Sequence, residues 1–300
     1  MYAMMLLGSL IGLSMVITML MTASPSVTRV KEVLTREISM DNEDKIDGLS
    51  LEDGSIDFDN VSFKYEEDTD AYQLKDIDLH IKSGEIIGIL GPTGSSKSTL
   101  VQLIPRLYDI TEGSLKVGGH DIRDYDLQTL RDDVSIVLQK NTLFSGSILE
   151  NLKWGDPDAS FKEVVAMAKL AQADEFVKER NDEYESELGQ GGTGVSGGQK
   201  QRLTIARSLL KKPKILILDN STSAVDTKTE SKLLEGFSKL DKDMTQIIIS
   251  QRLSSFDQAD RIVVMDNGSI ADVGTSEELY QRNEIYRLTY DIQNKGGEDE

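Results

Sequence analysis

Residues 91–99 constrain the fold more than any other part of the chain, and their sequence is Gly-Pro-Thr-Gly-Ser-Ser-Lys-Ser-Thr. The apolar run at residues 85–90 precedes this stretch, and its β-branched residues predict a buried strand. The apolar residues 100–104 follow it and predict the start of a helix. A strand, a turn of small residues, a lysine, a hydroxyl and a helix predict a phosphate-binding loop, because free N–H groups at a helix N-terminus bind anions.

The residue types of this loop suit a nucleoside triphosphate with its metal ion. Lys97 would reach the β- and γ-phosphates, and the Ser98 hydroxyl would bind Mg²⁺. Ser96 stands where the pattern has its second glycine, so we expect a strained or slightly reshaped backbone there. The alternative is a Gly/Ser-rich turn that precedes a helix by chance. The predicted nucleotide-binding residues of the loop are Gly91, Pro92, Thr93, Gly94, Ser95, Ser96, Lys97, Ser98 and Thr99.

The composition of the chain excludes several classes of function. Its 300 residues are enough for one large domain or two smaller ones. Its net charge of −19 argues against a nucleic-acid partner, because nucleic acids bind to basic surfaces. The absence of cysteine excludes disulfide bonds, cysteine-bound zinc and thiol chemistry, and it fits a reducing cytosolic compartment.

The first 26 residues differ in kind from the rest of the chain. They carry no charged residue and are rich in Met, Leu, Ile and Val, so they are long and apolar enough to cross a bilayer. A secretory signal peptide is the alternative, but the stretch has no basic residues before its apolar part and continues into a charged segment, which favours a membrane span. Because Arg29, Lys31 and Arg36 follow the span, the positive-inside rule predicts that the bulk of the chain is cytosolic.

Hydrophobic patterns predict strands that alternate with helices along the remaining chain. Alternating apolar residues predict strands at residues 56–65 and 76–81, and Asp266-Asn267-Gly268 is typical of a hairpin turn. A β-rich opening followed by the phosphate-binding loop predicts a mixed sheet, a parallel core and the α/β class. The other predicted elements are short strands at 115–117 and 135–138, a helical segment at 161–176, and buried strands at 214–219, 246–250 and 261–265.

A second motif lies between the phosphate-binding loop and the predicted strand that ends in Asp219. Residues 195–202 have the sequence Val-Ser-Gly-Gly-Gln-Lys-Gln-Arg. In this order, the three segments resemble the P-loop, signature and Walker B motifs of ATP-binding cassette (ABC) ATPases, over about residues 54–290. Taken alone, Ser-Gly-Gly could be an ordinary loop before an amphipathic helix. The resemblance implies the P-loop NTPase fold of ABC ATPases, with an antiparallel β-subdomain and a helical subdomain, preceded by one transmembrane helix.

The resemblance also implies roles for residues outside the loop. Tyr65 matches the aromatic residue that stacks on adenine, although a core tyrosine at a strand end is the alternative. Gln139 matches the Q-loop glutamine, which senses Mg²⁺ and faces the membrane domain, and residues 224–226 match the D-loop. Asp219 matches the Mg²⁺-coordinating acid. The implied metal ligands are Ser98, Gln139 and Asp219, and the implied ligands are ATP and Mg²⁺.

Three further positions, besides Ser96, depart from the family pattern. Asn220 follows Asp219, where the family usually has the glutamate that polarises the attacking water. Gln251 occupies the place of the switch histidine, and Gln190 replaces a glutamate in the loop before the signature. Because a neutral amide positions water without acting as a base, we expect the chain's own site to hold ATP-Mg²⁺ and to turn it over very slowly. Harmless variation in an active site is the alternative.

The resemblance implies that two cassettes sandwich two ATP molecules, each between one chain's P-loop and the other chain's signature. Here the signature is intact, so the chain resembles the degenerate-site subunit of heterodimeric ABC exporters. A second exporter half with the missing Glu and His is the expected partner. The alternatives are a self-sufficient homodimeric ATPase and a regulatory ABC protein without transport. The residues expected to serve the partner's site are Ser196, Gly197, Gly198 and Gln199.

These predictions divide the chain into four parts. We expect a transmembrane helix at 1–26, a linker at 27–53, the ABC ATP-binding domain at 54–290 with a helical subdomain at about 140–212, and a polar tail at 291–300. The expected location is the plasma membrane, with the ATP-binding domain in the cytoplasm. Since one span cannot line a transport path and exporter halves carry several, we expect a fragment or a truncated gene product. The transported substrate is not identified by any residue of this chain.

Overall fold

The computed structural model divides the chain into two compact units, Met1–Asp41 and Asn42–Glu300. It describes residues 1–35, 40, 42, 45–66, 69, 71–237 and 242–295. The predicted basic residue Arg36 and residues 296–300 of the predicted tail lie outside this described part.

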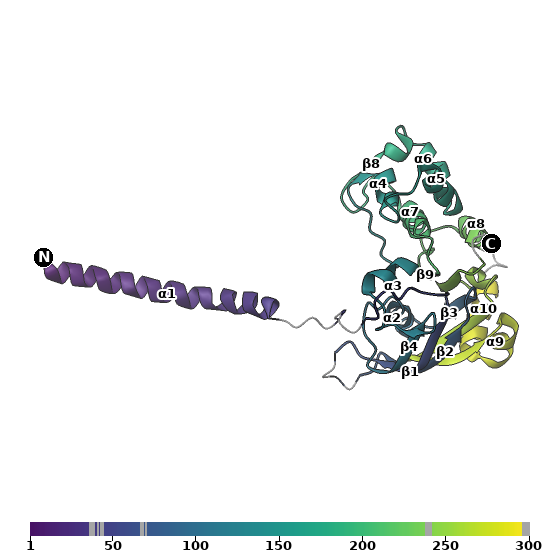
Figure 1. Ribbon diagram of the computed structural model, residues 1–300, viewed down its shortest axis with the longest axis horizontal. Coiled ribbons are helices and arrows are strands. Elements are labelled where there is room, and N and C mark those ends of the chain that lie inside the picture. Colours follow the sequence, from purple (N-terminus) through teal and green to yellow (C-terminus); the bar gives the residue numbers. More distant parts are fainter. Residues whose placement is uncertain are drawn as a thin grey trace. The chain divides into compact units, whose positions relative to one another are not determined.

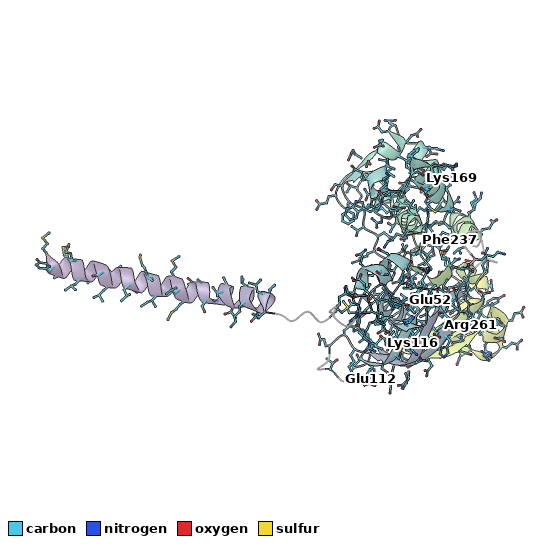
Figure 2. All side chains as sticks on the ribbon, in the orientation of Figure 1. Glu52, Glu112, Lys116, Lys169, Phe237 and Arg261 are labelled. Atoms are coloured by element: carbon cyan, nitrogen blue, oxygen red, sulfur yellow. The ribbon has the colours of Figure 1, made fainter. Side chains whose placement is uncertain are left out.

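The first unit contains a single long helix, α1 (Tyr2–Leu34), which includes Pro25 and has no buried residue. Its mean hydropathy reaches 2.1 over 18 residues, and it is long and apolar enough to cross a membrane. Its side chains point outward along its whole length (Figure 2). The hydroxyls of Ser9 and Thr18 donate to the carbonyls of Met5 (2.8 Å) and Ser14 (2.9 Å), so these polar groups are satisfied within the helix, as a lipid environment requires.

The second unit is organised around two β-sheets (Figure 1). The first sheet is antiparallel and has the strand order β2-β1-β4-β5. The second has the order β12-β11-β3-β10-β9-β6, in which only β12 runs antiparallel to its neighbour. A two-stranded sheet pairs β7 with β8. The strands are β1 (Ile56–Phe63), β2 (Leu74–Ile81), β3 (Ile86–Leu90), β4 (Glu112–Val117), β5 (His120–Asp121), β6 (Val134–Val137), β7 (Gly146–Ser147), β8 (Glu187–Leu188), β9 (Ile215–Asp219), β10 (Thr245–Ile249), β11 (Arg261–Asp266) and β12 (Ser269–Gly274).

Helices cover the sheets and build a separate helical group. Figure 1 shows α4, α5, α6 and β8 gathered away from the sheets, with α7 leading back toward them. This arrangement confirms the predicted α/β class with an antiparallel sheet and a helical subdomain. The helices are α2 (Lys97–Leu103), α3 (Leu127–Asp133), α4 (Ile148–Lys153), α5 (Phe161–Leu170), α6 (Asp174–Lys178), α7 (Gly197–Leu210), α8 (Thr227–Phe237), α9 (Ser276–Arg282) and α10 (Glu284–Lys295), with 3₁₀ turns η1 (Glu183–Glu185) and η2 (Leu253–Phe256).

The central strands are buried on both faces, which explains their continuous apolar sequence. In β9, Ile215 and Ile217 belong to the core shared with the antiparallel sheet, whereas Leu216 and Leu218 belong to the core that continues into the helical group. In β10, Ile248 points to the second core while its neighbours face the first. Both cores therefore fix the register of these strands.

Two sequence-based predictions of local structure have different outcomes. The predicted hairpin is confirmed, because Asp266 pairs with Ser269 and the two turn residues, Asn267 and Gly268, have φ angles of 46° and 80°. The predicted helical segment 161–176 is wrong as a single helix. It breaks between α5 and α6, where Gln172 adopts a left-handed φ of 55° that ends the helical path.

Close packing at Gly88 provides a test of this core. A Cβ at Gly88 would lie 2.6 Å from Cδ1 of Phe256, the last residue of η2. We expect Gly88→Ala to lower the free energy of unfolding by about 1–3 kcal/mol, because the ring must shift in a packed core. The measurement is urea denaturation of the full chain in detergent.

Gly236→Ala is the matched control for this substitution. The nearest atom to a Cβ there is the Leu170 carbonyl oxygen at 3.4 Å, an ordinary contact. Because alanine has a higher helix propensity than glycine, the free energy of unfolding of this variant should equal that of the wild type or exceed it by up to about 1 kcal/mol. A Gly88→Ala chain as stable as the wild type would contradict the described packing of η2 against β3.

Candidate nucleotide-binding site

The carboxyl ends of the parallel strands meet at one edge of the six-stranded sheet, where α/β proteins bind ligands. The phosphate-binding loop follows β3, and Asp219 is the last residue of β9. Gln251 follows β10 by two residues, and Gln139 follows β6 by two. Residues that lie far apart in the sequence are therefore brought to a common edge.

Lys97 lies over the loop that precedes it. Its Nζ donates to the carbonyl oxygens of Gly91 (2.8 Å) and Pro92 (2.7 Å) and to the Ser95 hydroxyl (3.2 Å). Burial lowers the pKa of Lys97, while the charge of Asp219 acts in the opposite direction. Because bonds from an ammonium group to anionic oxygens are stronger than those to neutral carbonyls, a phosphate is a better partner for Nζ than the loop's own backbone.

Ser96 has the strained backbone that the sequence led us to expect. It is the N-cap residue of α2, and its φ and ψ of 67° and 23° lie in the left-handed region. Its side chain makes no capping hydrogen bond there. This conformation is about 1–2 kcal/mol less favourable for a residue with a Cβ. Ser96 therefore destabilises the loop locally, whereas glycine would not.

Asp219 and Ser98 place two oxygen ligands side by side. Asp219 is only 2% exposed, and its carboxylate accepts hydrogen bonds from the Ser98 hydroxyl and from Nδ2 of Asn220 (3.3 Å). Burial raises the pKa of Asp219, whereas the two hydrogen bonds and the charge of Lys97 oppose this shift. A hydroxyl beside a carboxylate fits Mg²⁺, which takes one or two protein oxygens and completes its shell with water and phosphate. Within the described ranges, no group of three or more acidic or histidine side chains could hold a metal by itself.

A cavity of about 240 Å³ brings the predicted amides together. Asn220 is one of the lining residues, and its backbone has a left-handed φ of 46°, which asparagine tolerates better than most residues. Its N–H donates to the Ile249 carbonyl (3.0 Å). Gln139, Asn220 and Gln251, which no local sequence pattern connects, therefore line one cavity. The described lining consists of Gln139, Asn220, Thr222, Ser223, Glu230, Ser250, Gln251 and Arg252.

Glu230 was not predicted as part of this site. Its carboxylate is almost fully buried, and Oε1 accepts from the hydroxyls of Thr222 (2.6 Å) and Ser255 (2.7 Å). Oε2 accepts from a guanidinium nitrogen of Arg252 (2.8 Å). Both oxygens are thus engaged. Glu230 lies on α8 and Arg252 after β10, so only the folded chain reveals their contact.

Tyr65 lies beside the phosphate-binding loop. Its hydroxyl is 3.0 Å from Oγ1 of Thr99, and its ring makes edge contacts with Phe63 (4.9 Å) and Tyr108 (5.0 Å). The residue is 49% exposed, which differs from the buried core tyrosine considered as the alternative. About half of this aromatic residue next to the loop is therefore exposed to solvent.

The predicted signature forms the N-terminus of α7. The Ser196 hydroxyl accepts from the Gln199 N–H (3.3 Å), and Oε1 of Gln199 accepts from the Ser196 N–H (2.9 Å), which is a capping box. A Cβ at Gly198 would lie 2.7 Å from the Ala224 carbonyl oxygen, so the signature requires glycine to pack on the segment after Asn220. None of these signature residues is in the described lining of the 240 Å³ cavity.

Residues 74–223 match the sequence model of the ABC transporter family. The chain belongs to this family. The putative multidrug export ATP-binding/permease protein YgaD of Bacillus subtilis (strain 168) is 46% identical over 241 residues, which are 80% of this chain and 41% of that protein. A protein of the same description from Staphylococcus aureus (strain N315) is 45% identical over 246 residues, which are 82% of this chain and 42% of the relative.

A solved structure agrees with this family membership and with the ABC ATPase fold. The structure of a bacterial Atm1-family ABC exporter with ATP bound matches 94% of this ABC chain and 49% of its own chain, with a TM-score of 0.83 and 33% identity. The chain spans less than half of the length of these relatives. The matched family region 74–223 includes the phosphate-binding loop, the signature and Asn220, whereas Gln251 lies beyond it.

The strained residue of the loop yields a stability prediction for this ABC chain. Ser96→Gly should raise the free energy of unfolding by about 0.5–1 kcal/mol, because the gain from relieving the left-handed strain exceeds the extra chain entropy of glycine. Urea denaturation without nucleotide measures the change.

Thr93→Gly is the control in the same loop. Thr93 is not among the residues with a positive φ, so glycine relieves no strain there and should lower stability by about 0.5–1 kcal/mol. If Ser96→Gly were destabilised as much as Thr93→Gly, the strain assigned to Ser96 would be absent.

Proposed function

We propose that this chain is the ATP-binding part of an ABC exporter subunit with a degenerate site. It binds ATP-Mg²⁺ at its own P-loop and turns it over slowly. It also lends its signature helix to the ATP site of a second, different exporter half, and the two together drive transport across the membrane. The observation that carries this proposal is the composition of the cavity that follows Asp219. Neutral amides, Asn220 and Gln251, occupy the positions where a general base and a histidine are expected. The carboxylate in the described lining, Glu230, accepts hydrogen bonds on both of its oxygens.

Binding of ATP-Mg²⁺ is supported by the parts of the site that are intact. Lys97 would exchange its bonds to loop carbonyls for bonds to the β- and γ-phosphates. Ser98 and Asp219 would hold Mg²⁺, which neutralises charge on the phosphates, and Gln139 lies at the same edge as a further oxygen ligand. Tyr65 offers a half-exposed ring beside the loop for stacking on adenine.

Slow turnover is supported by the absence of a free base in the described lining of the cavity. Asn220 and Gln251 can orient a water molecule through their amides, but neither accepts its proton near neutral pH. Glu230 is held by two hydroxyls and a guanidinium, so it is not available as a substitute base. Loss of one general base typically costs about 10²–10⁴ in rate.

The signature helix is suited to a phosphate presented by a partner chain. The capping box uses the N–H groups of Ser196 and Gln199. The N–H groups of Gly197 and Gly198 precede the first intrahelical donor, so they remain for an anion, and the dipole of this 14-residue helix adds to the attraction. The chain thus keeps the N–H groups of its signature but has neutral amides at Asn220 and Gln251. This combination favours a division of labour between two different exporter halves.

Membrane association is supported by α1 and by the names of the relatives. α1 has the length and apolarity of a span, and the basic residues Arg29 and Lys31 lie at its C-terminal end, which favours a cytoplasmic ATP-binding domain in the plasma membrane. The domain limits given above (1–26, 27–53, 54–290 and 291–300) form part of this proposal. A self-sufficient homodimeric ATPase is the competing function, and turnover without a partner distinguishes the two.

Restoring the two missing groups should create turnover in the chain alone. We expect Asn220→Glu combined with Gln251→His to raise steady-state ATP hydrolysis by about 10²–10⁴ over the wild type, because a base then faces the attacking water. The neutral variant Asn220→Gln is the matched control and should stay at the wild-type rate. Rapid hydrolysis by the wild type, abolished by Lys97→Ala, would instead support the homodimeric ATPase.

The role of the signature can be tested in the same activated variant. Adding Ser196→Ala should lower its turnover at least about tenfold, because the helix tip that would face the phosphate loses a hydroxyl that could donate to it, in addition to its capping box. Ser160→Ala is the control, since Ser160 forms the same type of capping box on α5, away from the cavity. Equal losses from both substitutions would show that helix stability alone, rather than phosphate contact, explains the effect.

A further inference from the structure

We propose that Gln293 of α10 is a positioning residue for Gln251, so that the C-terminal helix sets how Gln251 faces the nucleotide. The inference rests on the proposed function, because it assigns regulation to the same site. The contact joins α10, near the end of the described chain, to the loop that follows β10.

The amide of Gln293 holds this loop by its main chain. Its Nε2 donates to the carbonyl oxygen of Gln251 (2.7 Å), and its Oε1 accepts from the N–H of Leu253 (3.0 Å). Both bonds go to the backbone on either side of Arg252, and the amide side chain supplies the donor for one and the acceptor for the other. The side chain of Gln251 takes no part in the clamp, and Gln251 is one of the residues that line the cavity.

A buried network holds the same loop from the opposite side. The Ser250 hydroxyl accepts from the Arg252 N–H (3.0 Å) and lies 2.8 Å from the Ser255 hydroxyl, which donates to Glu230. The Arg252 guanidinium donates to Glu230 and to the Val225 carbonyl (3.0 Å). The backbone around Gln251 is therefore fixed on the inside by Glu230 and on the outside by Gln293.

The outer clamp is the weaker of the two. Tyr286, near the start of α10, is 2% exposed and its hydroxyl lies 2.7 Å from that of Ser276, so this end of the helix is anchored. Gln293 lies at the other end, where Ile292 is 71% exposed and both clamp hydrogen bonds face solvent. Together, two such bonds can change the ratio of the held loop to the released loop by up to about a hundredfold. The loop can thus be released without unfolding the core.

Release of the loop should reduce the affinity for ATP-Mg²⁺. If Gln251 is placed correctly in only about a tenth of the molecules, the measured Kd rises about tenfold, because binding must first select that fraction. This effect requires the Gln251 side chain. Without it, the position of the loop no longer matters to the ligand.

A double-mutant cycle on the full chain in nanodiscs tests the positioning role. We expect Gln293→Ala to weaken ATP-Mg²⁺ binding about tenfold in the wild-type background and less than about twofold when Gln251→Ala is already present. Gln281→Ala, an exposed glutamine on α9, is the control and should leave the Kd unchanged. Equal losses in both backgrounds, or no loss in either, would overturn the inference.

Hydrogen exchange without nucleotide tests the clamp independently of ATP binding. Gln293→Ala should speed exchange of the Leu253 N–H about tenfold, because its acceptor is removed. Gln293→Glu keeps an acceptor for Leu253 but cannot donate to Gln251, so it should preserve this protection and still weaken ATP-Mg²⁺ binding. Unchanged exchange in Gln293→Ala would overturn the clamp. A wild-type chain that binds no ATP-Mg²⁺ would overturn the proposed function, whatever the exchange shows.

Discussion

The parallel pairing of β3, β10 and β9 determines where every group of the candidate site lies. Because these strands are buried on both faces, a shift in their register would move apolar side chains out of both cores, so the alignment is strongly specified. Ile249 is paired with Asp219 across the sheet, and the loops that follow the strands therefore leave from the same edge. Burial of apolar surface in the core is thus what places Lys97, Asp219 and Gln251 near each other.

The candidate site has local features that suit a polyanion although the chain as a whole is acidic. The net charge of −19 acts weakly at a distance, because salt screens exposed charges beyond about 8 Å at physiological ionic strength. The local field at the loop comes from Lys97 and from the backbone N–H groups at the start of α2. Burial strengthens this local field, and the same burial raises the pKa of Asp219 and lowers that of Lys97. Binding chemistry and net charge are therefore separate properties of this chain.

Much of the fold was predictable where short-range chemistry decides the structure. The phosphate-binding loop, the strand ending in Asp219 and the Asn267-Gly268 turn each follow from residue types at fixed spacing. The break at Gln172 was not predictable, because nothing in its sequence requires a left-handed residue there. Glu230 and Gln293 were also missed. Their roles arise from contacts between segments that are distant in the sequence, and no local pattern encodes such contacts.

The central claim is that this chain binds ATP but lacks the side chains needed to hydrolyse it. The most direct measurement identifies the nucleotide that the purified chain retains after prolonged incubation with ATP and Mg²⁺. The reaction is quenched, and the bound nucleotide is then identified by chromatography. The account predicts intact ATP in near-stoichiometric amount, and none on a Lys97→Ala chain. Retained ADP, formed by the wild-type chain without any partner, would contradict it.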